Sequence, residues 1–302
     1  MNAVQRLSRI ILICRDAKRL AAFYAGAFGF ICVEPLRADP TLAALIGRAE
    51  AEAMRLRLGD QMIDLAAVKP EGRAYPSGIA GWHPLFQHFA IVVSDMTAAY
   101  AGLQRTAGWT PISTAGPQPL PAASGGVTAF KFRDPEGHPL ELLAYAPGAT
   151  PAAWTIRGGP CLGIDHSAIS IADTARSVSF YDRLGLARTA GSHNVGVEQD
   201  RLDGIAGATV DVTALAPAQP TPHVELLCYR GDFDRSGTSA DPGDVAATQL
   251  VFAVSSRAAL DELIAASGAA VVAGPIVTPN GAAALLRDPD GHLVQFVSAH
   301  HV

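Results

Sequence analysis

Four short stretches of the chain alternate hydrophobic residues with polar or small ones, a pattern typical of half-buried β-strands. Each stretch runs for about six residues and is followed by an Asp or a Ser; the stretches begin at Arg9, His88, His166 and Gln249. These starts are separated by 79, 78 and 83 positions, so the pattern recurs with a period near eighty residues. The spacing indicates four copies of one structural unit.

A helix is predicted after each of these strands. The N-cap position, where a side-chain oxygen accepts hydrogen bonds from the first turn, is occupied by Asp16, Asp95, Asp173 and Ser256. Apolar residues then follow at intervals of three and four, as in a helix with one buried face. Glycines, which tolerate a positive φ, are predicted to end the helices. They are Gly29, Gly108, Gly185 and Gly268.

The back half of the unit repeats as well. Residues 126–143 read GVTAFKFRDPEGHPLELL, and residues 281–297 read GAAALLRDPDGHLVQFV. The shared Arg-Asp-Pro-x-Gly-His segment predicts a tight turn between two strands, because Pro fixes φ and Gly accepts an unusual backbone angle. Units one and three carry degenerate versions, which end in residues 61–67 and 223–229.

Loop-like segments rich in Pro, Gly and charge separate the units. The predicted units are residues 5–68, 85–146, 163–230 and 246–300, which group along the chain as 5–146 and 163–300. A single sheet of this kind has one apolar face and is not stable alone, so the units must pair around shared interiors. The expected fold is α+β, with four βαβββ modules paired into two incomplete barrels. Either neighbouring units pair, or the two inner units pair and the two outer units pair.

The composition limits the class of partner. The chain has 302 residues, of which 49% are hydrophobic, and its net charge is −5. Nucleic acid is not expected, because it requires a clustered basic face, and no apolar run is long enough for a membrane span. Four scattered cysteines without a CxxC pair favour reduced, buried thiols in a cytoplasmic protein. The expected partner is a small-molecule substrate, bound by a monomer or homodimer.

Several of these motifs together resemble a known superfamily. A strand is followed by a helix with a Phe-Tyr pair (residues 23–24 and 180–181), and an Asp-Pro-x-Gly-His turn precedes a Glu-bearing strand. This combination resembles the vicinal-oxygen-chelate superfamily of glyoxalases, ring-cleaving dioxygenases and bleomycin-resistance proteins. The resemblance implies that two units enclose a divalent metal ion. It also implies ligands from the first residue of the first strand and from the last strand of each unit.

Carried over to this chain, the resemblance implies eight positions. The first-strand positions are Arg9, His88, His166 and Gln249, and the last-strand positions are Asp64, Glu141, Glu225 and Gln295. Only the two inner units hold both a His and a Glu, so the implied metal ligands are His88, Glu141, His166 and Glu225. Imidazole and carboxylate ligands suit Zn, Ni, Mn or Fe(II). This distribution favours the nested pairing, because it collects all four ligands in one barrel.

A set of two His and two Glu resembles the metal site of glyoxalase I, a lyase in which one Glu moves a proton between adjacent carbons. Glu141 and Glu225 are therefore the candidate catalytic residues of a metal-dependent, glyoxalase-like enzyme whose substrate has adjacent oxygens. An Fe(II) ring-cleaving dioxygenase is an alternative, since it uses two His and one carboxylate. Gln249 and Gln295 stand where common four-unit dioxygenases have ligands, which argues against that reaction. A non-catalytic binding protein of the bleomycin-resistance type is the third interpretation.

Structural roles compete with the functional ones. A His at the start of a strand is often a hydrogen-bonded core residue, and Arg9 with Asp64 is expected to form a structural ion pair. His138 and His292 lie in the turns and are expected to be exposed or to cap them. His223 lies two residues before Glu225 on the same face and is a substitute ligand.

Overall fold

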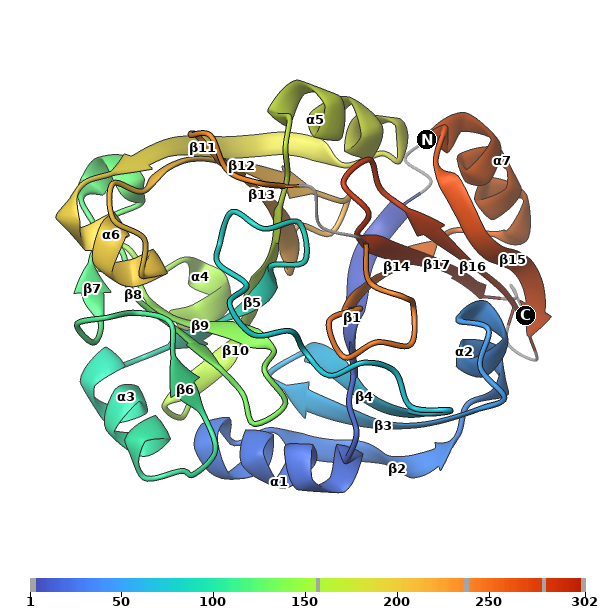
Figure 1. Ribbon diagram of the computed structural model, residues 1–302, viewed down its shortest axis with the longest axis horizontal. Coiled ribbons are helices and arrows are strands. Elements are labelled where there is room, and N and C mark those ends of the chain that lie inside the picture. The colour runs from blue at the N-terminus through green and yellow to red at the C-terminus, as the bar shows by residue number, and fades with distance from the viewer. Residues whose placement is uncertain (1–3, 156–157, 236–238, 279–280, 300–302) are drawn as a thin grey trace.

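The computed structural model describes residues 4–155, 158–235, 239–278 and 281–299. Its strands form two sheets, each of which curls around an interior without closing (Figure 1). We call them the outer sheet, built from units one and four, and the inner sheet, built from units two and three. Each sheet therefore takes one unit from residues 5–146 and one from residues 163–300, and residue 300 itself lies outside the described residues.

The outer sheet has eight strands. They are β1 (Val4–Ile13), β2 (Ile31–Ala38), β3 (Glu50–Leu58), β4 (Gln61–Lys69), β14 (Gln249–Val254), β15 (Ala270–Thr278), β16 (Gly281–Arg287) and β17 (Leu293–Ala299). Their order is β15-β16-β17-β14-β1-β4-β3-β2, so the first strands of units one and four pair at the centre.

The inner sheet has nine strands. They are β5 (Gln87–Val93), β6 (Thr110–Pro111), β7 (Gln118–Pro119), β8 (Thr128–Arg133), β9 (Pro139–Ala144), β10 (Cys161–Ser170), β11 (Ala187–Val195), β12 (Thr209–Ala216) and β13 (His223–Tyr229). Their order is β11-β12-β13-β10-β5-β9-β8-β6, with β7 also paired to β8. The nested pairing of units is thus the arrangement in the structure.

Seven α-helices lie within the described ranges: α1 (Ala17–Phe28), α2 (Pro40–Leu45), α3 (Met96–Gln104), α4 (Ala152–Thr155), α5 (Thr174–Arg183), α6 (Val197–Asp203) and α7 (Arg257–Ser267). All four predicted N-caps are confirmed, since each side chain accepts from the N–H three residues on. Gly29 and Gly268 end α1 and α7 with a positive φ, as predicted. The prediction is wrong for Gly108, because α3 ends at Gln104. Gly108 lies in the turn beyond, against Pro135.

The Phe-Tyr helices and the Arg-Asp-Pro-x-Gly-His turns bind one another. The hydroxyl of Tyr24 in α1 donates to Asp134 (2.9 Å), and Nε2 of His138 donates to the Ile13 carbonyl (3.0 Å). A carbonyl oxygen can only accept, and Nδ1 of His138 also faces Asp134, at 2.9 Å. Burial lowers the pKa of His138, but the charge of Asp134 outweighs it and the pKa is raised. The turn of unit two is therefore fastened to unit one by an imidazolium.

Equivalent contacts join units three and four. Tyr181 in α5 donates to Asp288 (3.0 Å), and Nε2 of His292 lies 2.7 Å from the Ser170 carbonyl. His138 and His292 are both buried, so the expectation of exposure is wrong for both. The error has a physical reason: the acceptors lie more than a hundred positions away in the chain, on the other sheet. These contacts therefore join units that are neighbours in the sequence, one with two and three with four. The sheets instead pair unit one with unit four and unit two with unit three.

The largest apolar core lies on the sheet faces that pack against α1, α3, α5 and α7. A second core fills the interior of the outer sheet, where Leu42, Ala43 and Leu45 of α2 pack with Ile11 and Val251. The outer barrel is therefore filled by hydrophobic side chains. The inner barrel differs, because it encloses a cavity of about 510 Å³.

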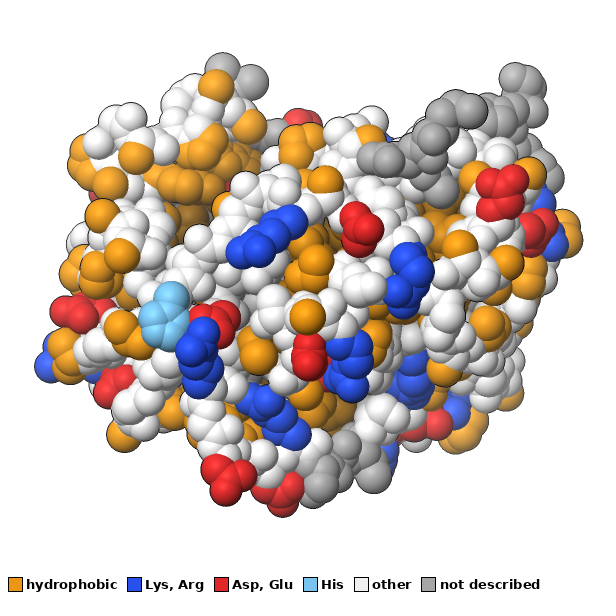
Figure 2. Space-filling view, turned by 90° about the horizontal axis from the view of Figure 1, so that it is seen from above, with side chains coloured by type: hydrophobic (Ala, Val, Ile, Leu, Met, Phe, Trp, Pro, Cys, Tyr) orange, Lys and Arg blue, Asp and Glu red, His pale blue; other side chains and the backbone are white. Residues whose placement is uncertain are grey.

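The surface gives few further indications. On the face shown in Figure 2, basic and acidic side chains are interspersed, and hydrophobic side chains gather in a hollow at the upper left. None of the helices described is long and apolar enough to cross a membrane. The cysteines are free, but the prediction of buried thiols is wrong for Cys32, which is exposed.

Candidate metal centre

The four implied ligands lie on four neighbouring strands of the inner sheet. His88 is on β5, Glu141 on β9, His166 on β10 and Glu225 on β13. The strand register aligns them in two rows, one of which runs from Glu141 through Ala90 to His166. The other runs from His88 through Ala168 to Glu225. An alanine stands between the two ligand positions of each row, which leaves room above the sheet.

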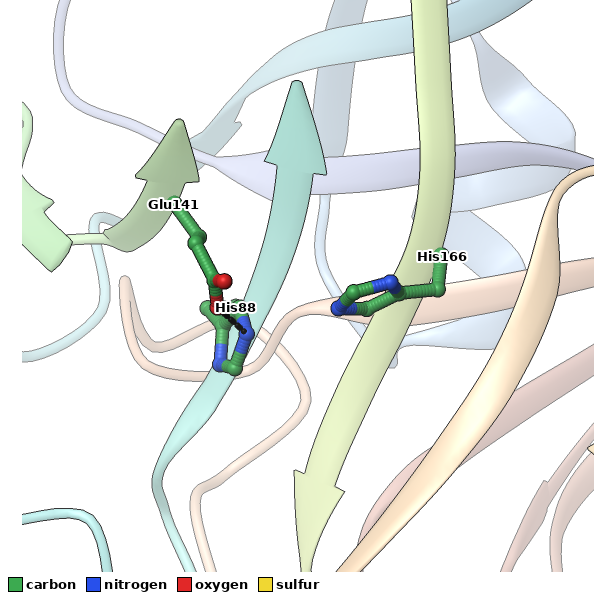
Figure 3. Close-up of side chains that lie close together, drawn as sticks. All are labelled: His88, Glu141 and His166. Atoms are coloured by element: carbon green, nitrogen blue, oxygen red, sulfur yellow. Dashed lines mark ion pairs between the residues drawn. The ribbon is translucent and has the colours of Figure 1, made fainter. Parts of the chain in front are cut away.

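Three of these side chains point toward one another (Figure 3). Nε2 of His88 lies 2.9 Å from Glu141 Oε2, and the rings of His88 and His166 are 5.8 Å apart between centroids. One ligand atom from each of His88, Glu141 and His166 lies within 4.8 Å of the other two. A single small cation placed among them would be within reach of all three.

Glu225 stands slightly apart from this group. Its Oε2 lies 3.5 Å from His166 Nε2, and its Oε1 lies 3.6 Å from His223 Nε2. The Glu225 side chain is 23% exposed to the cavity, whereas that of Glu141 is 8% exposed. His223 also joins Asp165 and His166 in a second group of the same compactness. His166 is thus shared between two sets of candidate ligands.

Asp165 is a site residue that the alternation of the strand concealed. Adjacent residues of a regular strand face opposite ways, yet Asp165 and His166 both line the cavity. The pairing of β10 with β5 shifts register between Ile164 and His166, and such a bulge re-aims side chains. Asp165 Oδ2 lies 3.0 Å from His166 Nδ1, while Tyr145 donates to Oδ1 at 3.0 Å. This carboxylate holds the His166 ring with Nε2 directed at the cluster.

Several ring nitrogens of the cluster have no hydrogen-bond partner. Among the residues described, this holds for Nδ1 and Nε2 of His88 and for Nε2 of His166, all of them buried. Buried polar atoms are normally satisfied, so orphaned imidazole nitrogens beside a carboxylate call for a ligand. Although 2.9 Å separates His88 Nε2 from Glu141, the two groups are not aligned for a hydrogen bond. Both are directed toward common space, and the donor set fits a divalent ion.

The protonation of the cluster follows from burial and charge. Burial lowers the pKa of His88, which keeps this imidazole neutral as a metal ligand must be. Burial also lowers the pKa of His166, but Glu225 and Asp165 raise it to about 9. Burial raises the pKa of Glu225, but His166 and His223 bring it down to about 2. Without a metal, His166 is therefore a cation between carboxylates at neutral pH.

The cavity that contains the cluster is lined by all four implied ligands. Most of the remaining wall is apolar, with Leu120, Val127, Leu143, Val212 and Leu227 among its residues. Lys131 also lines it and pairs with Asp203 (2.7 Å). A cavity of about 510 Å³ with apolar walls and a compact polar cluster suits a small organic molecule.

The equivalent positions of the outer sheet do not form such a cluster. Arg9 pairs with Asp64 (2.7 Å), which confirms the predicted ion pair, and Arg55 also binds Asp64 through two hydrogen bonds. Gln249 and Gln295 are buried. Ile11 and Val251 stand where the inner sheet has its two alanines, so the space above the sheet is filled.

The fold and this cluster define a class: two-barrel α+β proteins that gather imidazole and carboxylate side chains inside a barrel. The profile of the Glyoxalase/Bleomycin resistance protein/Dioxygenase superfamily matches residues 6–142 and 163–296. The chain therefore belongs to this superfamily. No curated protein sequence matches the chain.

Solved structures share the fold. Glyoxalase I from Zea mays is 18% identical, with a TM-score of 0.63 over 97% of this chain and 92% of that chain. A putative dioxygenase from Bacillus subtilis subsp. subtilis str. 168 is 14% identical, with a TM-score of 0.63 over 100% of this chain and 87% of that chain. At these identities the likeness establishes the architecture and leaves the reaction to the site.

Proposed function

We propose that this protein is a metal-dependent enzyme of the glyoxalase type that acts on a small substrate with adjacent oxygens. The observation that supports it most directly is the convergence of His88, Glu141 and His166 inside a cavity, with three buried ring nitrogens unpartnered. A core histidine retained only for packing would have its nitrogens hydrogen-bonded, as His138 does.

In this proposal His88, His166 and Glu141 hold the metal, with Glu225 at the open side. Nitrogen and oxygen ligands in this proportion suit Zn, Ni, Mn or Fe(II). A bound divalent ion would supply Lewis-acid polarisation of the substrate oxygens. Asp165 keeps Nδ1 of His166 protonated and directs Nε2 inward.

Glu225 is the better candidate for moving a proton between adjacent carbons. It lies outside the compact group and is more exposed to the cavity than Glu141. Its pKa is low because His166 and His223 lie beside it. A divalent ion bound beside it would keep this carboxylate ionised, which is the form that can accept a proton as a general base. The two implied catalytic glutamates thus divide into Glu141 as ligand and Glu225 as base.

Metal analysis of the purified protein, compared with His88→Ala and His166→Ala, tests the site. Loss of the same single metal equivalent in both variants is expected, because both ligands serve one ion. Retention of the full metal content in both would end the proposal. Proton transfer is tested by NMR in D₂O with 2-hydroxy aldehydes and ketones, where deuterium should enter at the carbinol carbon and Glu225→Gln should abolish it.

A second function has support from the same geometry. Two His and one carboxylate are the set that Fe(II) oxygenases use, and His88, His166 and Glu141 form such a set. Turnover of a catechol with oxygen uptake by the Fe(II)-loaded protein would select this reaction over proton transfer. Purification without metal but with a tightly retained aromatic molecule would favour a binding protein instead.

A further inference from the structure

Lys131 is a buried cation in the wall of the cavity that the proposed chemistry does not use. It lies on β8 between Phe130 and Phe132, which pack into the main core, so its side chain faces the other way. Across the strand pair it is directly opposite Glu141. Burying an ammonium group costs several kcal/mol, and lysine is almost never fully buried unless it is paired.

The ion-pair partner of Lys131 is itself fully supplied with donors. Asp203, at the end of α6, receives Lys131 Nζ on Oδ1 at 2.7 Å. Its Oδ2 accepts from Tyr229 (2.8 Å) and from Gln199 (2.7 Å). Three donors hold this carboxylate in a fixed position. Asp203 therefore keeps the ammonium charged and stationary at the cavity wall.

The ammonium, in contrast, has donors to spare. It carries three N–H groups, and in the described part of the chain Asp203 is its one hydrogen-bond acceptor. The equivalent residue of the outer sheet is Arg55, which lies opposite Asp64 in the same register. Arg55 uses its guanidinium on Asp64 and Glu34, as a structural cation does. Lys131 does not reach its opposite carboxylate and retains N–H groups for an acceptor in the cavity.

We propose that Lys131 binds a carboxylate of the substrate, so that the cavity takes small organic acids with an oxygen on the neighbouring carbon and an apolar body. The class of acid follows from position. Lys131 is opposite Glu141, and His88 and His166, which would hold the metal that binds the substrate oxygens, lie on the next two strands. The apolar body follows from the wall formed by residues such as Leu143 and Val212. The inference rests on the proposed function for the placing of the substrate oxygens.

Binding of phenyllactate and of its neutral amide, phenyllactamide, tests the proposal. Affinities are measured by calorimetry on the Zn-loaded full chain and on Lys131→Met, Lys131→Arg and Arg55→Met. The native protein should prefer the acid by on the order of 10- to 100-fold, which is the worth of a hydrogen bond between charged groups. Lys131→Met should abolish this preference, because it weakens the binding of the acid and not that of the amide. Lys131→Arg should restore part of the preference, and Arg55→Met should leave it unchanged.

Removing the lysine leaves Asp203 buried and unpaired, so the double variant with Lys131→Met and Asp203→Asn is measured as well. Equal weakening of acid and amide in the variants, or no binding of the acid to the native protein at millimolar concentration, would overturn the proposal. Metal content of the same samples separates the two claims. Selection of the acid through Lys131 without any bound metal would refute the proposed function and keep the recognition of acids. Bound metal without a preference for the acid would keep the proposed function and refute the recognition of acids by Lys131.

Discussion

Replacement of Asp165 by Asn tests whether the residue beside the cluster sets the affinity for metal. In the native protein Asp165 Oδ2 lies 3.0 Å from His166 Nδ1, and its other oxygen accepts from Tyr145. Because the carboxylate keeps the proton on Nδ1, Nε2 is the nitrogen whose lone pair a metal would use once His166 is neutral. Asn has nearly the same size and retains one acceptor oxygen, so the substitution removes mainly the charge.

The expected loss of affinity depends on pH, because Asp165 acts on His166 in two ways. Together with Glu225 it outweighs burial and raises the pKa of His166 to about 9. Below that pH a proton competes with the metal, and at pH 7 the competition weakens binding roughly 100-fold. Asp165→Asn reduces this competition, but it also weakens the imidazole as a ligand by roughly 10- to 100-fold. We expect the full loss above pH 9 and a clearly smaller loss at pH 7.

Metal affinity is measured by competition with a chromophoric chelator at pH 7 and pH 9.5. Asp211→Asn is the matched control, because Asp211 also lies close to a histidine Nδ1 (His193, 2.7 Å) but on the surface and outside the cavity. The control should bind metal like the native protein at both pH values. A loss in Asp165→Asn that is the same at both pH values, or absent at both, would refute the reasoning.

Three further predictions concern the cavity of the inner barrel and the contacts between unit one and the turn at residues 133–138. Ala90→Ile copies Ile11 of the outer sheet and should abolish metal retention while the circular dichroism spectrum is unchanged; native metal content would contradict it. Tyr24→Phe removes a buried donor to the Asp134 carboxylate and should lower the free energy of unfolding by about 1.5–3 kcal/mol in urea, with metal content as the control. His138 has a pKa raised above 6.5, so its stabilising contribution is complete below pH 6.5 and is lost as pH rises through the raised value. The difference in unfolding free energy between native protein and His138→Gln should therefore shrink at alkaline pH, and a constant difference would count against the imidazolium.

Much of the architecture could be predicted because its causes are local. A capping side chain acts on an N–H three residues away, and all four predicted caps are present. The repeat period reports how many units exist, whereas the pairing of units is a long-range property. It became predictable only through chemistry, since His88 and His166 with their glutamates belong together in one barrel. The observed order of strands agrees with that argument.

Other features depend on contacts that the sequence does not display. The bulge that turns Asp165 into the cavity follows no local rule, since a regular strand would place it on the opposite face from His166. Lys131 in an alternating strand is typical of a solvent-exposed face. It is buried because Asp203, from a helix of another unit 72 positions away, covers it. As one of several acidic residues in a helical pattern, Asp203 gave no indication in the sequence that it would pair with Lys131.

The contrast between the two barrels shows why ligand residues alone do not make a site. Both central strand pairs have the same antiparallel geometry, and the equivalent positions carry either Ala90 and Ala168 or Ile11 and Val251. The larger pair packs against α2 in the outer barrel and leaves no room above the sheet. Where the room is absent, a buried carboxylate needs a permanent cation from the protein, and Asp64 has Arg9 and Arg55. Where the room exists, Glu141 has two imidazoles beside it, each with at least one buried nitrogen that lacks a hydrogen-bond partner. The size of two side chains therefore decides whether the same backbone becomes a core or a candidate metal centre.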